Sequence, residues 1–424
     1  SQLLQQFYTI ADTALVGQAL GAEALAAVGT ASLILSVCIN FFIGFSAGLS
    51  VLVSHLYGEK DYTRLSALVQ SIFVTVLAFA VCLTAAGILL TPQLLAALST
   101  PAELIPTVST YLRITLGGML AQLLYNTASA ILRALGNTTS ALHYLAAAVV
   151  LNIALDILLL FIIPCGIAGA ALATVAAQYA AALLTLRKIL HLHGAWQFRL
   201  ARPFFVPKHL APILGTSIPA GLQAVFMSIA SLVIQTYINT FGYAAMAGMT
   251  VYARIEGFLY YPLFAFGIAL TSFIGQNVGA HDIARVRAGL GTSLRLAAFG
   301  AMGMALIAGL SAPTLVTLFT NDPAVTENAL DAVYYTFPFY WLYGINQIYI
   351  GAMRGLGNTL YPMMTALAAY CIFRVVWCWA WDLVGIHSMH IVYNAYNVSF
   401  LVMGALLYLG CKRELRRTAR KICA

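Results

Sequence analysis

Apolar residues fill this chain in long runs, which short segments rich in glycine, proline and polar residues separate from one another. A transmembrane helix needs about 20 consecutive apolar residues, and each run is long enough to cross a bilayer. The runs lack the alternation of apolar and polar residues that a transmembrane β-strand would show. The pattern predicts twelve helices, at residues 1–20, 24–53, 66–92, 105–135, 138–162, 167–191, 210–241, 245–277, 286–310, 326–355, 359–382 and 387–411.

The composition agrees with a membrane protein and excludes the soluble classes. Of the 424 residues, 62% are hydrophobic and only 8% are charged, whereas a soluble domain carries about 25% charged residues. We therefore predict an all-α polytopic membrane protein with two lobes of six transmembrane helices. The expected parts are an N-terminal lobe at 1–192, a cytoplasmic linker at 193–209, a C-terminal lobe at 210–411 and a basic cytoplasmic tail at 412–424. Because the chain begins inside an apolar run, we expect the first helix to be truncated.

The basic residues predict the orientation in the membrane. Of the 21 Lys and Arg residues, 18 fall on one set of connections, on the linker, on the tail or on the flanking ends of the adjoining helices. The other three, Arg113, Arg254 and Arg374, lie inside predicted helices. The opposite connections carry acidic residues and no Lys or Arg. Since basic residues accumulate on the cytoplasmic side, we expect a multi-pass protein of the cell (inner) membrane with both termini in the cytoplasm. This bias also accounts for the net charge of +8.

The two predicted lobes repeat each other at a constant offset of 221 residues. Gly21 corresponds to Gly242, and an Arg-x-Leu-Gly-Asn-Thr segment occurs at residues 133–138 and again at 354–359. Six helices return the chain to the side on which it entered, so the repeat is parallel and its axis runs along the membrane normal. Such repeats are common in carriers, in which two bundles move about a site at their interface.

Several motifs resemble those of multidrug and toxic compound extrusion (MATE) transporters, and they do so along essentially the whole chain. The matching segments are residues 12–17, 21–29, 57–64, 133–138, 151–156, 275–279 and 354–359. The resemblance implies twelve helices in two lobes around a central cleft, exporting organic cations in exchange for Na⁺ or H⁺. The first helix of this family normally carries a proline in an earlier part, which this sequence does not contain.

Four oxygen-bearing side chains in the first lobe are candidates for cation coupling: Asp12, Asn152, Asp156 and Thr174. With a helical rise of about 1.5 Å per residue, they are expected at about 9–15 Å from the outer ends of their helices. Carboxylate, amide and hydroxyl oxygens suit Na⁺ or a proton shared by two acids. In the resemblance, each of the four also matches a cation-coupling position of one MATE subgroup. The set predicts a possible Na⁺ site and leaves the choice between Na⁺ and H⁺ open.

An alternative role for these residues is hydrogen bonding between neighbouring helices. This alternative is favoured for Asn152 and Thr174 taken alone. For Asp12 and Asp156 a functional role is favoured, because a carboxylate in hydrocarbon is costly and usually marks an ion pathway. At the repeat offset the second lobe carries only apolar equivalents, namely Val233, Phe373, Trp377 and Ala395. Ion coupling is therefore expected in the first lobe only.

The second lobe offers candidates for a substrate cleft: Arg254, Glu256, Tyr260, Tyr340 and Tyr343. Glu256 lies well inside an apolar helix and needs a partner or a water-filled cavity. Some MATE subgroups place an essential acid on helix 7, which has none here, so no role is carried over to Glu256. Aromatic faces attract flat cations, although such rings are also ordinary packing residues. The alternative for Glu256 is a structural contact with Arg374 or with a backbone group.

These features together predict a secondary active antiporter for amphipathic organic cations, with Na⁺ or H⁺ as the coupling ion and no tightly bound cofactor. We expect membrane lipids as partners, no nucleic acid, and a monomer. A lipid-linked oligosaccharide flippase of the wider superfamily is the alternative, but it would require several basic residues in the cleft. An enzyme is not expected, because pairs such as His387-x-x-His390 lack a nearby acidic ligand in metalloprotease spacing. An ion channel fits the parallel repeat poorly.

Overall fold

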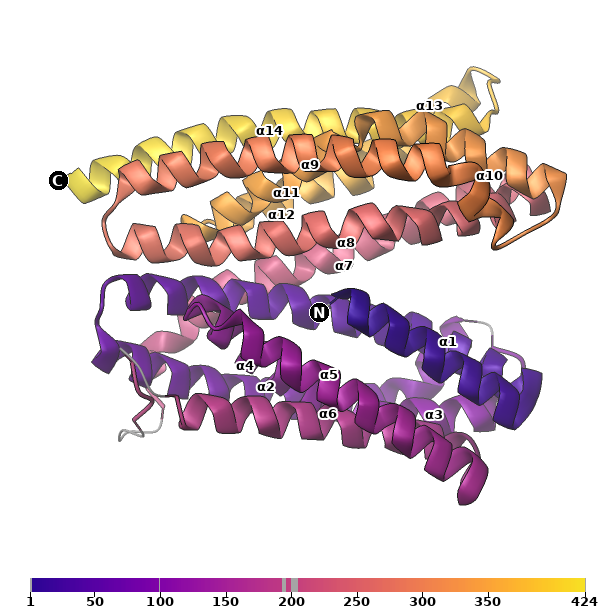
Figure 1. The fold of residues 1–424 in the computed structure, drawn as a ribbon, viewed down its shortest axis with the longest axis horizontal. Helices are drawn as coiled ribbons and strands as arrows, with labels where there is room; N and C mark the ends of the chain where they lie inside the picture. The colour runs from indigo at the N-terminus through magenta and orange to yellow at the C-terminus, as the bar shows by residue number, and fades with distance from the viewer. Residues whose placement is uncertain (1, 99, 193–195, 200–204, 424) are drawn as a thin grey trace. The chain divides into compact units, whose positions relative to one another are not determined.

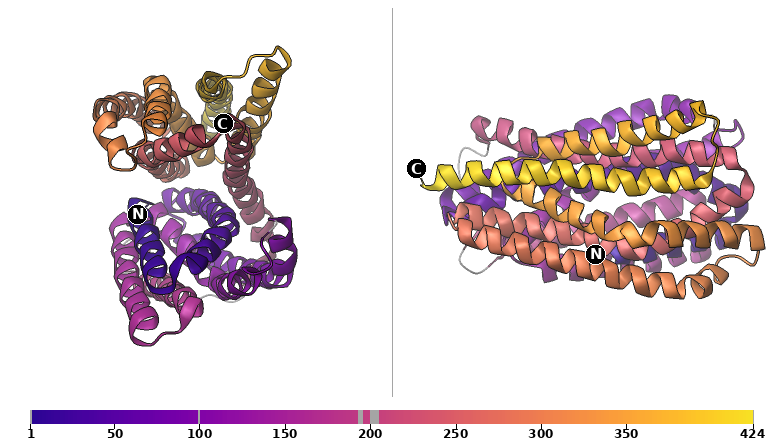
Figure 2. Two further views of the ribbon diagram at one scale, coloured as in Figure 1. Left: turned by 90° about the vertical axis from the view of Figure 1, so that its right-hand side faces the viewer. Right: turned by 90° about the horizontal axis from the view of Figure 1, so that it is seen from above.

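The computed structural model describes residues 2–98, 100–192, 196–199 and 205–423, and within them the side chains from residue 12 to residue 422. Its contacts divide the chain into two compact units, Ser1–Ser217 and Ile218–Ala424. Each unit is a bundle of helices (Figures 1 and 2), and the described residues contain no β-strand. The predicted all-α class is confirmed.

The first unit ends with residues 207–217, which are described below, and before them it contains six α-helices and one π-helix. They are α1 (Gln2–Gly58), α2 (Tyr62–Ala97), α3 (Ile105–Gly117), α4 (Met119–Ala134), α5 (Thr138–Ile157), the π-helix η1 (Leu158–Ile162) and α6 (Gly166–Leu190). Within α1, Gly21 has φ 81° and ψ −170°, a conformation that only glycine adopts readily. The backbone therefore kinks at Gly21, and α1 consists of two of the predicted membrane helices.

The remaining elements follow in the order predicted for the second lobe. They are η2 (Pro207–His209), α7 (Leu210–Ile238), η3 (Asn239–Phe241), α8 (Tyr243–Gly279), α9 (Ile283–Thr317), α10 (Pro323–Thr336), η4 (Phe337–Phe339), α11 (Tyr340–Gly355), α12 (Leu360–Ala366), the π-helix η5 (Leu367–Ile372), α13 (Phe373–Leu383) and α14 (Met389–Cys423). Basic residues 412–421 thus continue α14 as a helix. Nine helices of the described chain are long and apolar enough to cross a membrane.

The backbone has the same local structure at several matching positions of the internal repeat. Gly242 (φ 88°, ψ −177°) has the conformation of Gly21. Asp61 and Asp282 each cap the helix that follows, accepting hydrogen bonds from the backbone N–H groups of Arg64 at 3.0 Å and Arg285 at 2.8 Å. Such a cap satisfies a donor that the first turn of a helix leaves free. These caps place the starts of α2 and α9 a few residues before the predicted apolar runs.

Two predicted helices are each divided in the structure. Gly118 separates α3 from α4, and a Cβ at this position would lie 2.6 Å from Val175 Cγ2. At the matching place in the repeat, η4 with its Pro338 separates α10 from α11. A proline lacks the backbone N–H that a continuous helix requires. Hydropathy predicted one helix in each case, because the residues at these breaks are as apolar as the helices on either side of them.

The boundary between the two compact units falls inside α7, between Ser217 and Ile218, whereas the sequence placed the second lobe from residue 210. The start of α7 packs on α1: a Cβ on Gly48 would lie 2.5 Å from the Thr216 carbonyl oxygen. Trp196 belongs to the same unit. It is 2% exposed and donates from Nε1 to the hydroxyl of Ser66 on α2 at 3.0 Å. Residues 193–195 and 200–204 of the predicted linker lie outside the described residues.

Candidate functional site

The four predicted coupling residues lie on three helices that pack against one another. Asp12 is on α1, Asn152 and Asp156 are one turn apart on α5, and Thr174 is on α6 (Figure 1). Contacts join α1 to α5, α1 to α6 and α5 to α6. All four residues are buried, with exposures of 6%, 0%, 0% and 6% in chain order. The fold therefore brings together the residues that the sequence selected from three separate segments.

Hydrogen bonds connect the polar groups of this cluster. In the amide orientation that satisfies both of its partners, Asn152 donates to Asp156 Oδ2 at 3.0 Å and accepts from the backbone N–H of Thr174 at 3.2 Å. The side chains of Asp12 and Asp156 lie within hydrogen-bonding reach of each other. Two ionised carboxylates at this range repel unless a proton or a cation lies between them.

Each carboxyl group keeps one buried oxygen without a hydrogen-bond partner among the described residues: Oδ1 of Asp12 and Oδ1 of Asp156. Buried polar atoms are almost always paired in folded proteins, and an unpaired one requires an explanation. Hard oxygen donors from two acids and an amide are suited to a small hard cation. The donor set and its free oxygens therefore fit either a bound cation or a proton.

The sequence did not identify two features of this cluster. Tyr111 of α3 is buried and lies close enough for the charges of Asp12 and Asp156 to act on its hydroxyl group. The π-helix η1 begins at Leu158, two residues after Asp156, and π-helical turns are frequent at functional sites. The sequence does not show which residues of other helices a tyrosine in an apolar run will contact. Hydropathy also does not distinguish a π-helical turn from an α-helical turn.

In the second unit, four of the five substrate-cleft candidates lie together. The Glu256 carboxylate accepts a hydrogen bond from the hydroxyl of Tyr340 at 3.0 Å. The ring of Tyr343 lies 5.2 Å from that of Tyr340 and is stacked on that of Tyr260 at 5.3 Å. Tyr340 and Tyr343 belong to the buried core of this unit. Arg254 is exposed and does not join the cluster.

The histidines of the His387-x-x-His390 pair are exposed and bind single carboxylates. His387 Nδ1 lies 2.8 Å from Asp382 Oδ1, and His390 Nε2 lies 3.3 Å from Asp331 Oδ2. Asp382 also accepts from the hydroxyl of Tyr237 at 2.6 Å. The two histidines therefore hold separate partners.

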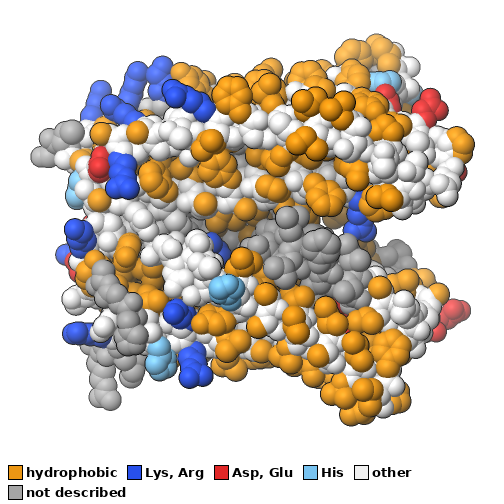
Figure 3. Space-filling view, in the orientation of Figure 1, with side chains coloured by type: hydrophobic (Ala, Val, Ile, Leu, Met, Phe, Trp, Pro, Cys, Tyr) orange, Lys and Arg blue, Asp and Glu red, His pale blue; other side chains and the backbone are white. Residues whose placement is uncertain are grey.

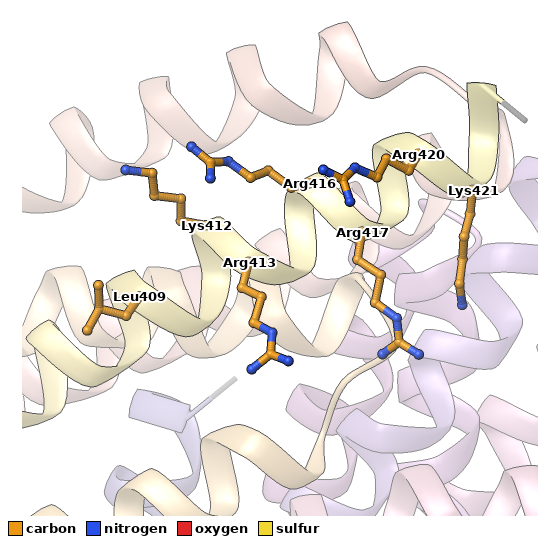
Figure 4. Close-up of a pocket in the computed structure, with 7 residues that line it drawn as sticks. All are labelled: Leu409, Lys412, Arg413, Arg416, Arg417, Arg420 and Lys421. Carbon is orange, nitrogen blue, oxygen red and sulfur yellow. The ribbon is translucent and has the colours of Figure 1, made fainter.

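Basic side chains gather at the end of the second unit where the chain terminates, and most of the acidic side chains on the visible face lie at the opposite end (Figure 3). Along the last turns of α14, Lys412, Arg416 and Arg420 follow one side of the helix (Figure 4). Arg413, Arg417 and Lys421 follow another side and, with the first three and Leu409, line a surface hollow of about 510 Å³. Residues four apart share a helix face, so the end of α14 carries two adjoining basic stripes.

Comparison with known proteins agrees with this architecture. The family model described as MatE matches residues 1–158 and 219–380. A probable multidrug resistance protein of Bacillus subtilis, YpnP, is 30% identical over 88% of this chain and 83% of its own length. A second one from the same organism, YoeA, is 27% identical over 96% of this chain and 90% of its own length.

A solved structure shares the fold. The crystal structure of a MATE protein in the bent conformation superposes with a TM-score of 0.93 at 20% identity, covering 99% of this chain and 94% of that one. It supports the arrangement of twelve membrane helices in two lobes. The family match spans well over half of the sequence, and one relative is 30% identical across most of both chains. The chain therefore belongs to the MatE family of multidrug and toxic compound extrusion (MATE) transporters and is a multi-pass membrane transporter.

Proposed function

We propose that this transporter is a secondary active antiporter, which exports amphipathic organic cations in exchange for Na⁺ or H⁺. The coupling ion binds in the first unit, at the cluster of Asp12, Asn152, Asp156 and Thr174. Its relatives YpnP and YoeA are described as probable multidrug resistance proteins, which supports drug export as the activity. The parallel repeat supports a mechanism in which the two lobes move about a central cleft.

The observation that carries this proposal is the pair of buried carboxyl groups on α1 and α5. Each retains a buried oxygen without a partner among the described residues, and the two groups lie within reach of one another. A cation that enters this site relieves their repulsion and satisfies the free oxygens. A cation that leaves it restores both costs. The occupied and the empty site therefore differ in free energy, and an ion gradient can use this difference to drive a change of the protein's conformation.

We further propose that the protein lies in the cell (inner) membrane as a monomer with both termini in the cytoplasm. The two basic stripes at the end of α14 support this orientation, because basic residues collect on the cytoplasmic side. There they attract the anionic lipid headgroups of that leaflet, at about 1 kcal/mol for each Lys or Arg near the surface.

Transport by purified protein in liposomes tests the proposal. Efflux of tetraphenylphosphonium, an organic cation, is measured with an inward Na⁺ gradient, with an inward proton gradient and with neither. We expect one of the two gradients to drive efflux in the unaltered protein. Asp12→Asn and Asp156→Asn should each reduce driven efflux to the level without a gradient, because each removes one charge from the site.

Asp331→Asn is the matched control for these variants. It changes an exposed carboxylate of the second unit that contacts His390, and we expect it to leave driven efflux unchanged. Full gradient-driven efflux by either Asp12→Asn or Asp156→Asn, with normal insertion and folding, would refute the coupling site. Flux at channel rates that needs no gradient would refute exchange altogether.

Binding of ²²Na⁺ to the purified protein across pH identifies the ion. If Na⁺ is the coupling ion, saturable binding should be present and should disappear in both aspartate variants. If the proton is the coupling ion, ²²Na⁺ should not bind saturably, and efflux should follow the proton gradient alone.

A further inference from the structure

Arg374 is a buried cation in the second unit whose role the coupling site does not explain. It lies at the start of α13, directly after the π-helix η5, and is 6% exposed. Its Nε donates to the hydroxyl of Ser399 on α14 at 2.8 Å. Burying a guanidinium group is costly unless other groups compensate its charge. The surroundings of Arg374 must therefore replace the water that it has lost.

Aromatic rings supply the first part of this compensation. The Arg374 Cζ atom lies 4.3 Å from the ring centre of Tyr396, 4.6 Å from that of Tyr370 and 5.6 Å from that of Phe400. All three distances are within the range in which a cation is attracted by an aromatic face. Three such rings from η5 and α14 form an aromatic cage, and Arg374 occupies it.

Glu256 supplies the second part. The charge of Arg374 acts on the Glu256 carboxyl, although these two described side chains form no direct ion pair. Phe400 connects the cage to the Glu256 cluster, since its ring lies 6.1 Å from that of Tyr370 and 6.1 Å from that of Tyr340. An aromatic cage with a nearby carboxylate is a suitable receptor for a flat organic cation.

In the internal repeat, this part of the second unit corresponds in sequence to the coupling-site helix of the first unit. In the first unit, the helix that contains η1 carries Asn152 and Asp156, which can hold a mobile cation. In the second unit, the helix that contains η5 carries Arg374, whose equivalent at the offset of 221 residues is Ile153, next to Asn152. In the repeat, the positively charged side chain of Arg374 in the second lobe thus corresponds to the proposed site for a free cation in the first lobe.

We propose that the cage of Tyr370, Tyr396 and Phe400, together with Glu256, is a binding site for a guanidinium or a similarly flat organic cation, and that Arg374 occupies it as a built-in ligand. A free cation enters only by displacing the Arg374 side chain, so Arg374 sets the affinity of the site. The assignment of this ligand as a transported substrate rests on the proposed function, whereas its binding does not require an ion gradient.

The test is thermal unfolding of the full chain in detergent with added methylguanidinium. Arg374→Ala empties the cage and keeps its three rings and Glu256. We expect a methylguanidinium concentration ten times its Kd to raise the melting temperature of Arg374→Ala by about 3–6 °C. The unaltered protein should shift far less, because Arg374 competes for the cage. Methylurea, which has nearly the same shape and no charge, should leave both proteins unchanged.

Two further variants make the result specific. Arg254→Ala removes an exposed arginine two residues from Glu256, and it should respond to methylguanidinium no more than the unaltered protein. Combining Arg374→Ala with Glu256→Gln should abolish the response, since the cage then lacks its carboxylate. A methylguanidinium shift equal in Arg374→Ala, Arg254→Ala and the unaltered protein would overturn the proposal. A folded Arg374→Ala that does not respond would overturn it as well.

Arg374→Lys covers the case in which Arg374→Ala does not fold. Lysine keeps a positive charge but has a compact ammonium group that fits the rings less well than a planar guanidinium. We expect methylguanidinium to raise the melting temperature of Arg374→Lys by a smaller amount than in Arg374→Ala, and still by more than in the unaltered protein. No difference from the unaltered protein would contradict the proposal. None of these measurements uses transport, so a failure here is distinguishable from a failure of ion coupling.

Discussion

Replacing Gly267 with alanine tests how closely two helices of the second unit pack. Gly267 on α8 faces α11, where an added Cβ would lie 2.6 Å from the backbone carbonyl oxygen of Gln347. Ordinary contact begins at 3.4 Å, so the two backbones would have to separate by about 0.8 Å. Glycine at such contacts allows membrane helices to approach closely. Adding a methyl group to a well-packed interface costs about 1–3 kcal/mol.

Gly303→Ala in α9 is the matched control. A Cβ there would meet nothing within 4 Å, so this variant experiences only the effect of alanine on helix stability, a gain of about 0.4–1 kcal/mol. Because both variants share that gain, the difference between them measures the packing cost. For a unit of this size, about 1–3 kcal/mol corresponds to a difference of about 2–12 °C in melting temperature.

The assay is thermal unfolding of the purified protein, followed by its intrinsic tryptophan fluorescence. We expect Gly267→Ala to melt below Gly303→Ala by this amount. If Gly267→Ala melts at or above the temperature of Gly303→Ala, the close approach of α8 and α11 deduced from these positions is wrong.

Three other predictions concern the coupling site, the linker and the basic end. Asn152→Leu should weaken binding of the coupling ion by about 10- to 100-fold, because a hydrogen bond to a charged group contributes about 1.5–3 kcal/mol; undiminished ion binding would exclude this role. Trp196→Phe should lower the free energy of unfolding by about 0.5–1.5 kcal/mol through loss of the bond to Ser66, and an unchanged denaturation midpoint would contradict it. Combining Arg416→Ala with Arg420→Ala should remove about 2 kcal/mol of the added stability that anionic lipid nanodiscs give over zwitterionic ones. An equal lipid effect in the double variant and the unaltered protein would show that these two arginines do not contact the headgroups.

Hydropathy and the internal repeat predicted the order of the membrane helices, because both can be detected in the sequence without knowing how the helices pack. The ends of several helices could not be predicted in this way. The apolar run at 286–310 marks the part of α9 suited to hydrocarbon, whereas the helix itself extends over Ile283–Thr317 and starts at the Asp282 cap. A polar residue can continue a helix beyond the membrane, so composition alone does not show where the helix ends.

The acids of the candidate coupling site could be selected from sequence because a buried carboxylate in an apolar run is rare and costly. The surroundings of Glu256 and Arg254 could not be predicted equally well. Both lie in the same apolar helix, two residues apart, yet Glu256 joins the tyrosine cluster while Arg254 is exposed. The aromatic cage was also beyond sequence reasoning, because Arg374 and Tyr396 are brought together only by the packing of α13 against α14.

The division of α7 between the two compact units has a mechanical consequence. Its residues up to Ser217 belong to the first unit, and those from Ile218 onward belong to the second. If α7 were a straight, rigid helix, any rotation of one unit would be transmitted directly to the other. Pro219 stands just past the boundary and has no N–H for the backbone hydrogen bond that a regular helix would make there. The missing hydrogen bond makes α7 easier to bend next to the boundary between the two units.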